Sequence, residues 1–287
     1  MLFLSIIIPS YNREHSVTNS INSVLQQSEK DVEIIVVDDG STDNTKETLS
    51  DLIESKTIKY IFQQNKGVCA ARNEGAKNAI GKYLLFLDSD DFLVSDAIEQ
   101  FKITSKCEDV QLLFGDIERR VSQQMKGEVV KATDPYGKGI GKGLYLAGAF
   151  CIKRDFFNQL GGYDEAIKYG ENAELKFRIE KNNPTMAFVN KVVMIYNVAE
   201  EGGNNNLINK VHSNEYIIKK HLDYFTQYPR VLQFYLQNNA VAYVKLHQFK
   251  DARQSIKRAW LAYPKSIKTF IRMIIMFFPF FSKRIWR

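Results

Sequence analysis

The chain has 287 residues, of which 45% are hydrophobic and 25% charged, as is ordinary for a soluble globular protein with a sizeable core. Its three cysteines are far apart and lack CxxC spacing, which argues against a disulfide framework or a zinc site and fits a reducing compartment. The net charge of +6 comes from residues 252–287, which hold nine Lys and Arg and no Asp or Glu, so charge gives little support to a nucleic-acid partner.

Short apolar runs with strand character alternate with helical patterns through the first half of the chain. The predicted strands are 3–8, 32–37, 58–62, 82–87 and 110–114. This alternation predicts an α/β fold with a mainly parallel sheet flanked by helices. Right-handed crossovers then bring the carboxyl ends of the strands to one edge. The apolar N-terminus has no basic region and no cleavage site, so we interpret it as a buried strand rather than a signal peptide.

The second half of the chain changes character and is predicted to end in helices. Residues 115–145 are polar and glycine-rich, which predicts a loop. The elements predicted after it are a strand at 145–152, helices at 154–160 and 171–181, a hairpin or strand pair at 185–197 and a linker at 200–206. Beyond the linker the pattern is helical, with breaks near Pro229 and Pro264. We therefore predict a domain over residues 1–205 and a helical extension over 206–287.

Three carboxylates follow the predicted strand 82–87 within four residues, at Asp88, Asp90 and Asp91. Carboxylates at this density repel one another, and a hard cation among them relieves the repulsion. The carboxyl ends of strands are also where open α/β sheets bind their ligands. The alternative is a solvated acidic turn in which Asp91 or Ser95 caps the next helix.

Five motifs follow one another along the chain with compatible spacing: SIIIPSYN (5–12), EIIVVDDGSTDNT (33–45), NKGVCAARNEG (65–75), GKYLLFLDSDD (81–91) and LGGYDE (160–165). Each motif is weak alone, but together they resemble a family 2 glycosyltransferase of the GT-A fold. The resemblance covers residues 2–200 and implies a Rossmann-like GT-A domain that binds a nucleotide sugar. It says little about which sugar or acceptor is used.

The resemblance implies a UDP-sugar donor lying across the strand ends. The residues that it assigns to nucleotide-sugar binding are Pro9, Tyr11, Arg13, Asp39, Arg72, Asp88 and Ser89. In this assignment Pro9 and Tyr11 line the pocket for uracil and ribose, and Asp39 bonds the base. Arg72 lies one turn into the helix that follows the loop at 65–67, where its side chain could meet the diphosphate or hold a carboxylate.

The resemblance also implies a metal-binding DxD motif at residues 88–90. Asp90 would be the main protein ligand of Mn²⁺ or Mg²⁺, and Asp88 would face the ribose or the metal. A hard divalent ion prefers oxygen ligands, bridges the diphosphate and stabilises the departing nucleoside diphosphate.

Members of this family invert the anomeric carbon in one displacement and need a carboxylate to take the proton of the acceptor hydroxyl. The base is usually the Asp of a Glu-Asp pair that opens a helix after the GG(F/Y)DE segment. Here the pair is Glu171 and Asn172, and an amide cannot act as a general base. Glu171, Asp164 or Glu174 could serve instead, or the chain could be inactive. We expect an active enzyme that uses Glu171 or a neighbour.

The sequence therefore predicts an inverting, metal-dependent transfer of a sugar from a UDP-sugar to a glycan or a lipid-linked saccharide. The alternative is a non-catalytic pseudo-transferase that binds a nucleotide sugar, which only Asn172 supports. A sugar-phosphate nucleotidyltransferase is disfavoured, because the Gly-rich loop expected after the first strand is missing and residues 10–12 stand there. We expect no nucleic-acid partner.

The C-terminal segment 264–287 is rich in apolar and aromatic residues and is flanked by basic ones. Its apolar run is shorter than the roughly 20 residues that a membrane-spanning helix needs. This pattern fits a helix lying in an anionic membrane interface. The alternative is a terminal helix packed on the body or on a dimer partner. We expect a cytoplasmic protein, with the option of peripheral attachment to the inner face of the membrane.

Overall fold

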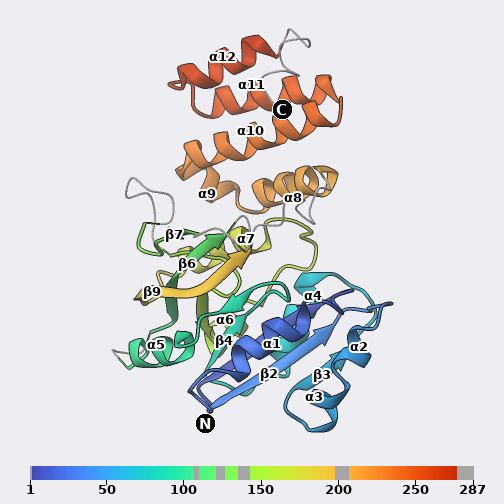
Figure 1. Cartoon of the computed structure of the whole chain (residues 1–287). Helices are drawn as coiled ribbons and strands as arrows, with labels where there is room; N and C mark the ends of the chain where they lie inside the picture. Colours follow the sequence, from blue (N-terminus) through green and yellow to red (C-terminus); the bar gives the residue numbers. More distant parts are fainter. Residues whose placement is uncertain (1, 107–109, 121–126, 135–142, 198–206, 277–287) are drawn as a thin grey trace. The chain divides into compact units, whose positions relative to one another are not determined.

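The computed structural model describes residues 2–106, 110–120, 127–134, 143–197 and 207–276. The chain divides into two compact units: unit 1 comprises Met1–Glu165 and Glu171–Gly202, and unit 2 comprises Ala166–Gly170 and Gly203–Arg287. The boundary predicted between residues 205 and 206 lies outside the described residues. Figure 1 shows both units and labels their helices and several of the strands.

Unit 1 is built on one nine-stranded sheet in the described part of the chain. Its strands are β1 (Leu4–Ser10), β2 (Val32–Asp38), β3 (Lys59–Phe62), β4 (Tyr83–Phe86), β5 (Phe92–Leu93), β6 (Leu112–Arg120), β7 (Glu128–Val130), β8 (Phe150–Lys153) and β9 (Met186–Asn197). The order across the sheet is β3-β2-β1-β4-β8-β6-β9-β5, with β7 paired to β6. The first four strands in this order are parallel to one another, whereas β8 is antiparallel to both of its neighbours. The predicted α/β fold is confirmed, with a sheet that is parallel at the N-terminal strands and mixed beyond them.

Helices cover both faces of this sheet because successive side chains of a buried strand point to opposite sides. On one face, Ile6 and Ile8 of β1 pack in the same core cluster as α1 (Val17–Leu25) and α5 (Ala97–Thr104). On the other face, Ile7 packs with α4 (Val68–Lys77), α6 (Arg154–Gln159) and α7 (Glu171–Lys181). The short helices α2 (Thr45–Thr48) and α3 (Ser50–Glu54) follow β2.

Helix α4 lies very close to the sheet, as its small residues predict. A Cβ atom placed on Gly75 would lie 2.4 Å from Cγ2 of Ile7, so no larger residue fits there without movement. This close approach fixes the start of α4, and with it Arg72, relative to the strand ends.

Two predictions about the second half of unit 1 are wrong. Residues 115–120, expected in a loop, extend β6 to Arg120, and β7 pairs with β6 beyond them. Residues 186–197, expected as a hairpin or strand pair, form the single strand β9. The pairing of β9 with β6 shifts between Gly115 and Ile117, so the exposed residues Asn190 and Lys191 bulge out of the ladder instead of forming a turn. Residues 135–142, which hold most of the glycine cluster, lie outside the described residues.

Unit 2 is helical, as predicted. Its helices are α8 (Leu207–Lys220), α9 (Leu222–Gln227), α10 (Pro229–Lys245), α11 (Phe249–Ala262) and α12 (Ile267–Ile275). Pro229 begins α10, and Pro264 lies in the turn between α11 and α12, so both predicted breaks are confirmed. Helices α10, α11 and α12 stack on one another (Figure 1). Within the described ranges, no helix is both long and apolar enough to cross a membrane.

Candidate functional site

The carboxyl ends of three neighbouring parallel strands bring polar side chains to one edge of the sheet. Strand β1 lies between β2 and β4, and Ser10 at the end of β1 is paired with Asp38 at the end of β2. The acidic residues 88–91 follow the end of β4. The edge predicted from the sequence is therefore formed, and the chain segments assigned to nucleotide-sugar binding meet along it.

The loops after β1 and β2 are tied to each other by hydrogen bonds. The Asn12 backbone N–H donates to Ser41 Oγ (2.9 Å), and the Thr42 N–H donates to Asn12 Oδ1 (2.8 Å). Asn12 has φ of 53°, a left-handed conformation that Asn adopts more readily than most residues. These bonds hold the segment so that Tyr11 is 46% exposed next to the buried Pro9. Tyr11 thus offers an open aromatic ring at the sheet edge, and Arg13 is exposed beside it.

Asp39 is buried, and protein donors bind both of its carboxylate oxygens. Oδ1 accepts hydrogen bonds from Gln63 Nε2 (2.6 Å) and from the Lys66 N–H (2.9 Å), and Oδ2 accepts one from the Gly67 N–H (2.8 Å). The structure therefore uses Asp39 to hold the loop that leads into α4. Sequence reasoning assigned Asp39 to the base and did not foresee this second task.

Arg72 is 2% exposed and joins two carboxylates that are far apart in the sequence. Its Nη2 donates to Asp88 Oδ1 (2.7 Å), and its Nη1 donates to Glu171 Oε1 (3.0 Å). The guanidinium carbon lies 5.2 Å from the centre of the Tyr163 ring. Burial alone would lower the pKa of Arg72, but Asp88, Tyr163 and Glu171 outweigh it and raise the pKa. The sequence predicted that Arg72 contacts either the diphosphate or a carboxylate, and in the structure it holds two carboxylates.

The acidic turn after β4 is fixed in place by α1 and β9. Ser20 Oγ donates to the carbonyl oxygen of Asp91 (2.8 Å), and the Asn197 N–H donates to Asp91 Oδ1 (3.2 Å). Asp91 is buried, and this burial, together with the charges of Asp88 and Asp90, raises its pKa to about 8. Partial removal from water and then the Asp88 charge raise the pKa of Asp90, although its side chain reaches the surface. The turn therefore brings together three carboxyl groups that disfavour one another's ionisation, and Arg72 pairs with one of them, Asp88.

The helix-cap interpretation of this turn is wrong. Helix α5 begins at Ala97, and its N-cap position is occupied by Asp96 rather than by Asp91 or Ser95. Ser89 is buried, and Asp88 is one-third exposed.

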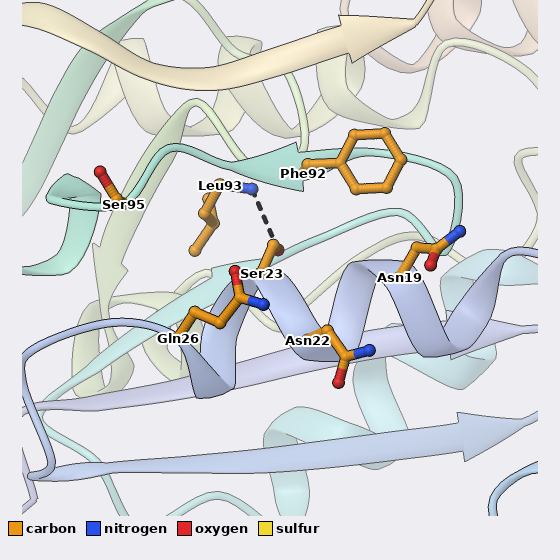
Figure 2. A pocket seen from close by; sticks show the side chains of 7 residues that line it. All are labelled: Asn19, Asn22, Ser23, Gln26, Phe92, Leu93 and Ser95. Atoms are coloured by element: carbon orange, nitrogen blue, oxygen red, sulfur yellow. Dashed lines mark hydrogen bonds between the residues drawn. The ribbon is translucent and has the colours of Figure 1, made fainter.

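A cavity of about 420 Å³ lies beside the acidic turn, between α1 and β5 (Figure 2). Its lining is mostly polar and consists of Asn19, Asn22, Ser23, Gln26, Phe92, Leu93 and Ser95. Ser23 Oγ accepts a hydrogen bond from the Leu93 N–H (3.2 Å), which fastens β5 to α1. None of the predicted site residues lines this cavity, so we interpret it as part of the support of the turn.

The start of α7 forms a network around Glu171. The Tyr163 hydroxyl donates to Asn172 Oδ1 (2.9 Å), and Asn172 Nδ2 lies 3.4 Å from Glu171 Oε1. Asn73 holds the segment before α7, because its side chain bonds both the N–H and the carbonyl oxygen of Tyr163. Among the described residues, the hydrogen bonds to Glu171 all end on Oε1, which leaves Oε2 to face other groups.

The two other candidate bases lie in different surroundings. Glu174 is fully buried, and Arg178 binds both of its oxygens at 2.6–3.0 Å. This ion pair stabilises α7 from within and does not link Glu174 to Asp88. Asp164 is half-buried in the segment before α7. Of the three, Glu171 is the one that the structure joins to the acidic turn, through Arg72.

Comparison with known proteins agrees with this arrangement. The sequence profile described as Glycosyl transferase family 2 matches residues 5–104, which include the strand ends and the acidic turn. Residues 5–104 of this chain thus match a family 2 glycosyltransferase domain. It is 38% identical over 147 residues to an uncharacterized glycosyltransferase of Rickettsia conorii, which covers 51% of this chain and 23% of that protein.

A second relative has a more specific name. The UDP-Glc:alpha-D-GlcNAc-diphosphoundecaprenol beta-1,3-glucosyltransferase WfgD of Escherichia coli is 34% identical over 127 residues, which cover 44% of this chain and 50% of that protein. The chain thus spans half or less of the length of both relatives.

Solved structures share the fold at low sequence identity. Staphylococcus aureus TarS, residues 1–349, in complex with UDP-GlcNAc superposes with a TM-score of 0.64 at 15% identity and covers 99% of this chain and 91% of that chain. A structure of TarS gives a TM-score of 0.65 at 18% identity and covers 98% of this chain and 53% of that chain. The predicted GT-A-like fold is confirmed.

The chemistry of the acidic turn fits a hard divalent cation. The described residues include no group of three or more His, Cys, Asp or Glu side chains placed to hold a metal by themselves. Asp88 and Asp90 supply carboxylate oxygens of the kind that Mn²⁺ and Mg²⁺ prefer, and partial burial together with the charge of Asp88 raises the pKa of Asp90. A cation bound at this turn would therefore need further oxygen ligands from a bound diphosphate or from water.

Sequence reasoning missed two residues that shape the site, Tyr163 and Asn73. Both lie inside the motifs that carried the resemblance, but no role was assigned to either. A signal was present, because Asn73 is a polar residue directly after Arg72 in a helix of small apolar residues. Asn73 and Tyr163 are 90 residues apart in the sequence, so only the folded domain reveals that they are in contact.

Proposed function

We propose that this protein transfers a sugar from a UDP-sugar to a glycan or lipid-linked saccharide, with inversion at the anomeric carbon and with the help of Mn²⁺ or Mg²⁺. The observation that carries the proposal is the double ion pair of Arg72, which joins the acidic turn of the donor side to Glu171 at the start of α7. The name of WfgD, which describes a UDP-glucose donor and a diphosphoundecaprenol-linked acceptor, supports the donor and acceptor classes. The TarS complex with UDP-GlcNAc supports a UDP-sugar on this fold.

The donor would lie along the ends of β1, β2 and β4. The exposed ring of Tyr11 would stack on the uracil above Pro9, and Arg13 would face the phosphates. Asp39 would shape the base pocket by holding the loop before α4, besides any bond of its own to the base.

The acidic turn would hold the diphosphate end of the donor. Asp90, with Asp88, would bind the cation, which when present stabilises charge on the departing nucleoside diphosphate. Ser89 is buried between them and would keep the two carboxylates apart on the same side of the turn. Arg72 would not need to contact the donor, since its role would be to hold Asp88 by a hydrogen bond.

Glu171 would act as the general base. The acceptor oxygen would attack the anomeric carbon from the side opposite to the diphosphate, as its proton passes to Glu171 Oε2 and the bond from carbon to diphosphate oxygen breaks. Arg72 holds the other carboxylate oxygen, which keeps Glu171 oriented. Asn172, held by the Tyr163 hydroxyl, would then be a positioning residue that donates to Glu171 instead of being the base.

The second candidate function is nucleotide-sugar binding without transfer. It is favoured by one observation, the amide of Asn172 at the position where the family usually has its basic Asp. A donor panel of nucleotide sugars with Mn²⁺, in which binding and turnover are measured together, separates the two functions. Binding without turnover of any donor would support the non-catalytic function.

The role of Glu171 is tested with Glu171→Gln. We expect this variant to bind UDP as the wild type does and to lose at least about 100-fold in transfer rate, the usual size of a general-base contribution. Glu180→Gln is the matched control, because Glu180 lies on the same helix and pairs with Lys176 at the surface. Transfer by Glu171→Gln at the wild-type rate would show that another group takes the proton.

A further inference from the structure

Helix α12 has one face that is packed on its neighbours in unit 2. Thr269 and Met276 on this face are buried. Gln237 of α10 donates to Thr269 Oγ1 (2.7 Å), and Arg253 of α11 donates to the carbonyl oxygen of Met276 (3.3 Å). The Ser266 side chain accepts the Thr269 N–H and caps the helix. These contacts fix the rotation of α12 about its axis, and on its other face the Phe270 ring meets Trp260 of α11, with the ring centres 5.7 Å apart.

The other face of α12 is apolar and open. Ile267, Phe270, Ile271 and Ile274 are 75%, 41%, 50% and 45% exposed. Their spacing of i, i+3, i+4 and i+7 places them in a single stripe along the helix. We name these four residues the α12 stripe. A stripe of this spacing normally faces a core, and a cluster of exposed apolar residues marks an interaction site.

The charges around the stripe indicate what it binds. Lys265 and Lys268 are exposed beside it, and no Asp or Glu occurs between residues 252 and 276. An apolar stripe with basic flanks matches the acyl boundary and the phosphates of an anionic bilayer. Two copies of this chain paired stripe to stripe would instead bring their lysines together, which opposes association.

The length of α12 favours a helix that lies on the bilayer. It spans nine residues, whereas a spanning helix needs about 20. A surface helix needs only one apolar face, and α12 presents that face while its other side stays packed on α10 and α11.

We propose that the α12 stripe is a membrane-docking surface that binds bilayers rich in anionic phospholipid. The four apolar side chains enter the boundary between headgroups and acyl chains, and Lys265 and Lys268 contact the lipid phosphates. The surface is independent of the transfer chemistry, although docking would concentrate the protein where a lipid-linked acceptor resides.

The test is sedimentation of the full-length protein with vesicles of phosphatidylcholine, with and without phosphatidylglycerol. We expect binding only to the anionic vesicles. The variant Ile267→Gln with Phe270→Gln should bind at least tenfold more weakly. The matched control is Leu222→Gln with Phe234→Gln, which removes two equally exposed apolar side chains of unit 2 outside α12 and should bind within twofold of the wild type.

A second arm tests the basic flanks. Lys265→Gln and Lys268→Gln should each weaken binding about fivefold at low salt, the effect of one basic residue near an anionic surface.

Equal binding of the stripe variant and the wild type, or equal binding to neutral and anionic vesicles, would overturn the proposal. A dimer that the stripe variant dissociates, with no vesicle binding, would assign the stripe to a second copy and also overturn it. Sedimentation needs neither donor nor acceptor, so a failure of the proposed transferase function leaves this result unaffected.

Discussion

The double ion pair of Arg72 gives the most direct prediction about stability and activity together. Arg72→Met keeps most of the length of the side chain and removes its charge. Asp88 and Glu171 would then face each other across the site without a shared cation. Removing one partner of a buried ion pair costs about 3–5 kcal/mol when the other is left fully buried. Here Asp88 is 33% and Glu171 17% exposed, so water replaces part of the lost interaction.

We therefore expect the free energy of unfolding of unit 1 to fall by about 3 kcal/mol, from the lower end of that range. For a unit of this size the midpoint temperature should drop by about 8 °C. Transfer should fall at least about 100-fold, because Glu171 loses the group that orients it. Arg72→Lys should recover about half of the stability, since one ammonium group cannot donate to two carboxylates in the fork geometry of a guanidinium.

The measurements are thermal unfolding followed by circular dichroism, transfer with the donor found in the panel, and UDP binding by calorimetry. Arg154→Met is the control, because Arg154 is a half-buried arginine of unit 1 that bonds the carbonyl oxygen of Ala79 away from the acidic turn. It should lower stability by about 1 kcal/mol, the value of one ordinary hydrogen bond, and leave transfer unchanged. If Arg72→Met unfolds and transfers sugar as the wild type does, the ion pairs neither stabilise unit 1 nor position Glu171.

Two further substitutions test the contact between Asn172 and Glu171 and the packing of α4 on the sheet. Asn172→Asp places a second carboxylate beside Glu171, where an amide nitrogen now lies 3.4 Å from Oε1, and should lower the turnover number about tenfold with little change in donor KM. A turnover number above that of the wild type would instead make position 172 the better site for the base. Gly75→Ala forces a Cβ atom against Ile7 and should lower the free energy of unfolding by about 2 kcal/mol in urea titrations, whereas Lys77→Ala at an exposed position of the same helix should be neutral. Equal stability of the two alanine variants would show that α4 can move away from the sheet at no cost.

The sequence predicted the sheet of unit 1 well where its signals are local. Strands β1, β2 and β4 each contain a continuous apolar run that ends at a polar turn, and such a run is buried on both faces where it lies inside a parallel sheet. The breaks at Pro229 and Pro264 were predictable for the same reason, because proline lacks the backbone donor that a helix interior requires.

The contacts that join distant segments could not be predicted in the same way. Arg72 and Glu171 are 99 residues apart, and nothing in either segment indicates the other. The resemblance assigned Asp39 to the base, and no local pattern indicated that its oxygens also bind the loop before α4. The hairpin or strand pair predicted at 185–197 is a single strand with a bulge at Asn190 and Lys191, since polar residues inside a strand pattern fit a turn or a bulge until the partner strand is known.

The bulge in β9 restricts which insertions and deletions this strand can accept. Before it, the even-numbered residue Phe188 packs with the α4 side of the sheet, whereas after it the even-numbered Met194 packs with the α1 side. Across the two register shifts, Asn190, Lys191 and Val193 have no partner in β6, and this odd number of extra residues inverts the phase of the strand. Loss of a single residue there would turn the Asn197 N–H away from Asp91 and leave that buried carboxyl without its backbone donor. Relatives that keep the acidic turn in this form should accept length changes near residues 190–191 only in steps of two.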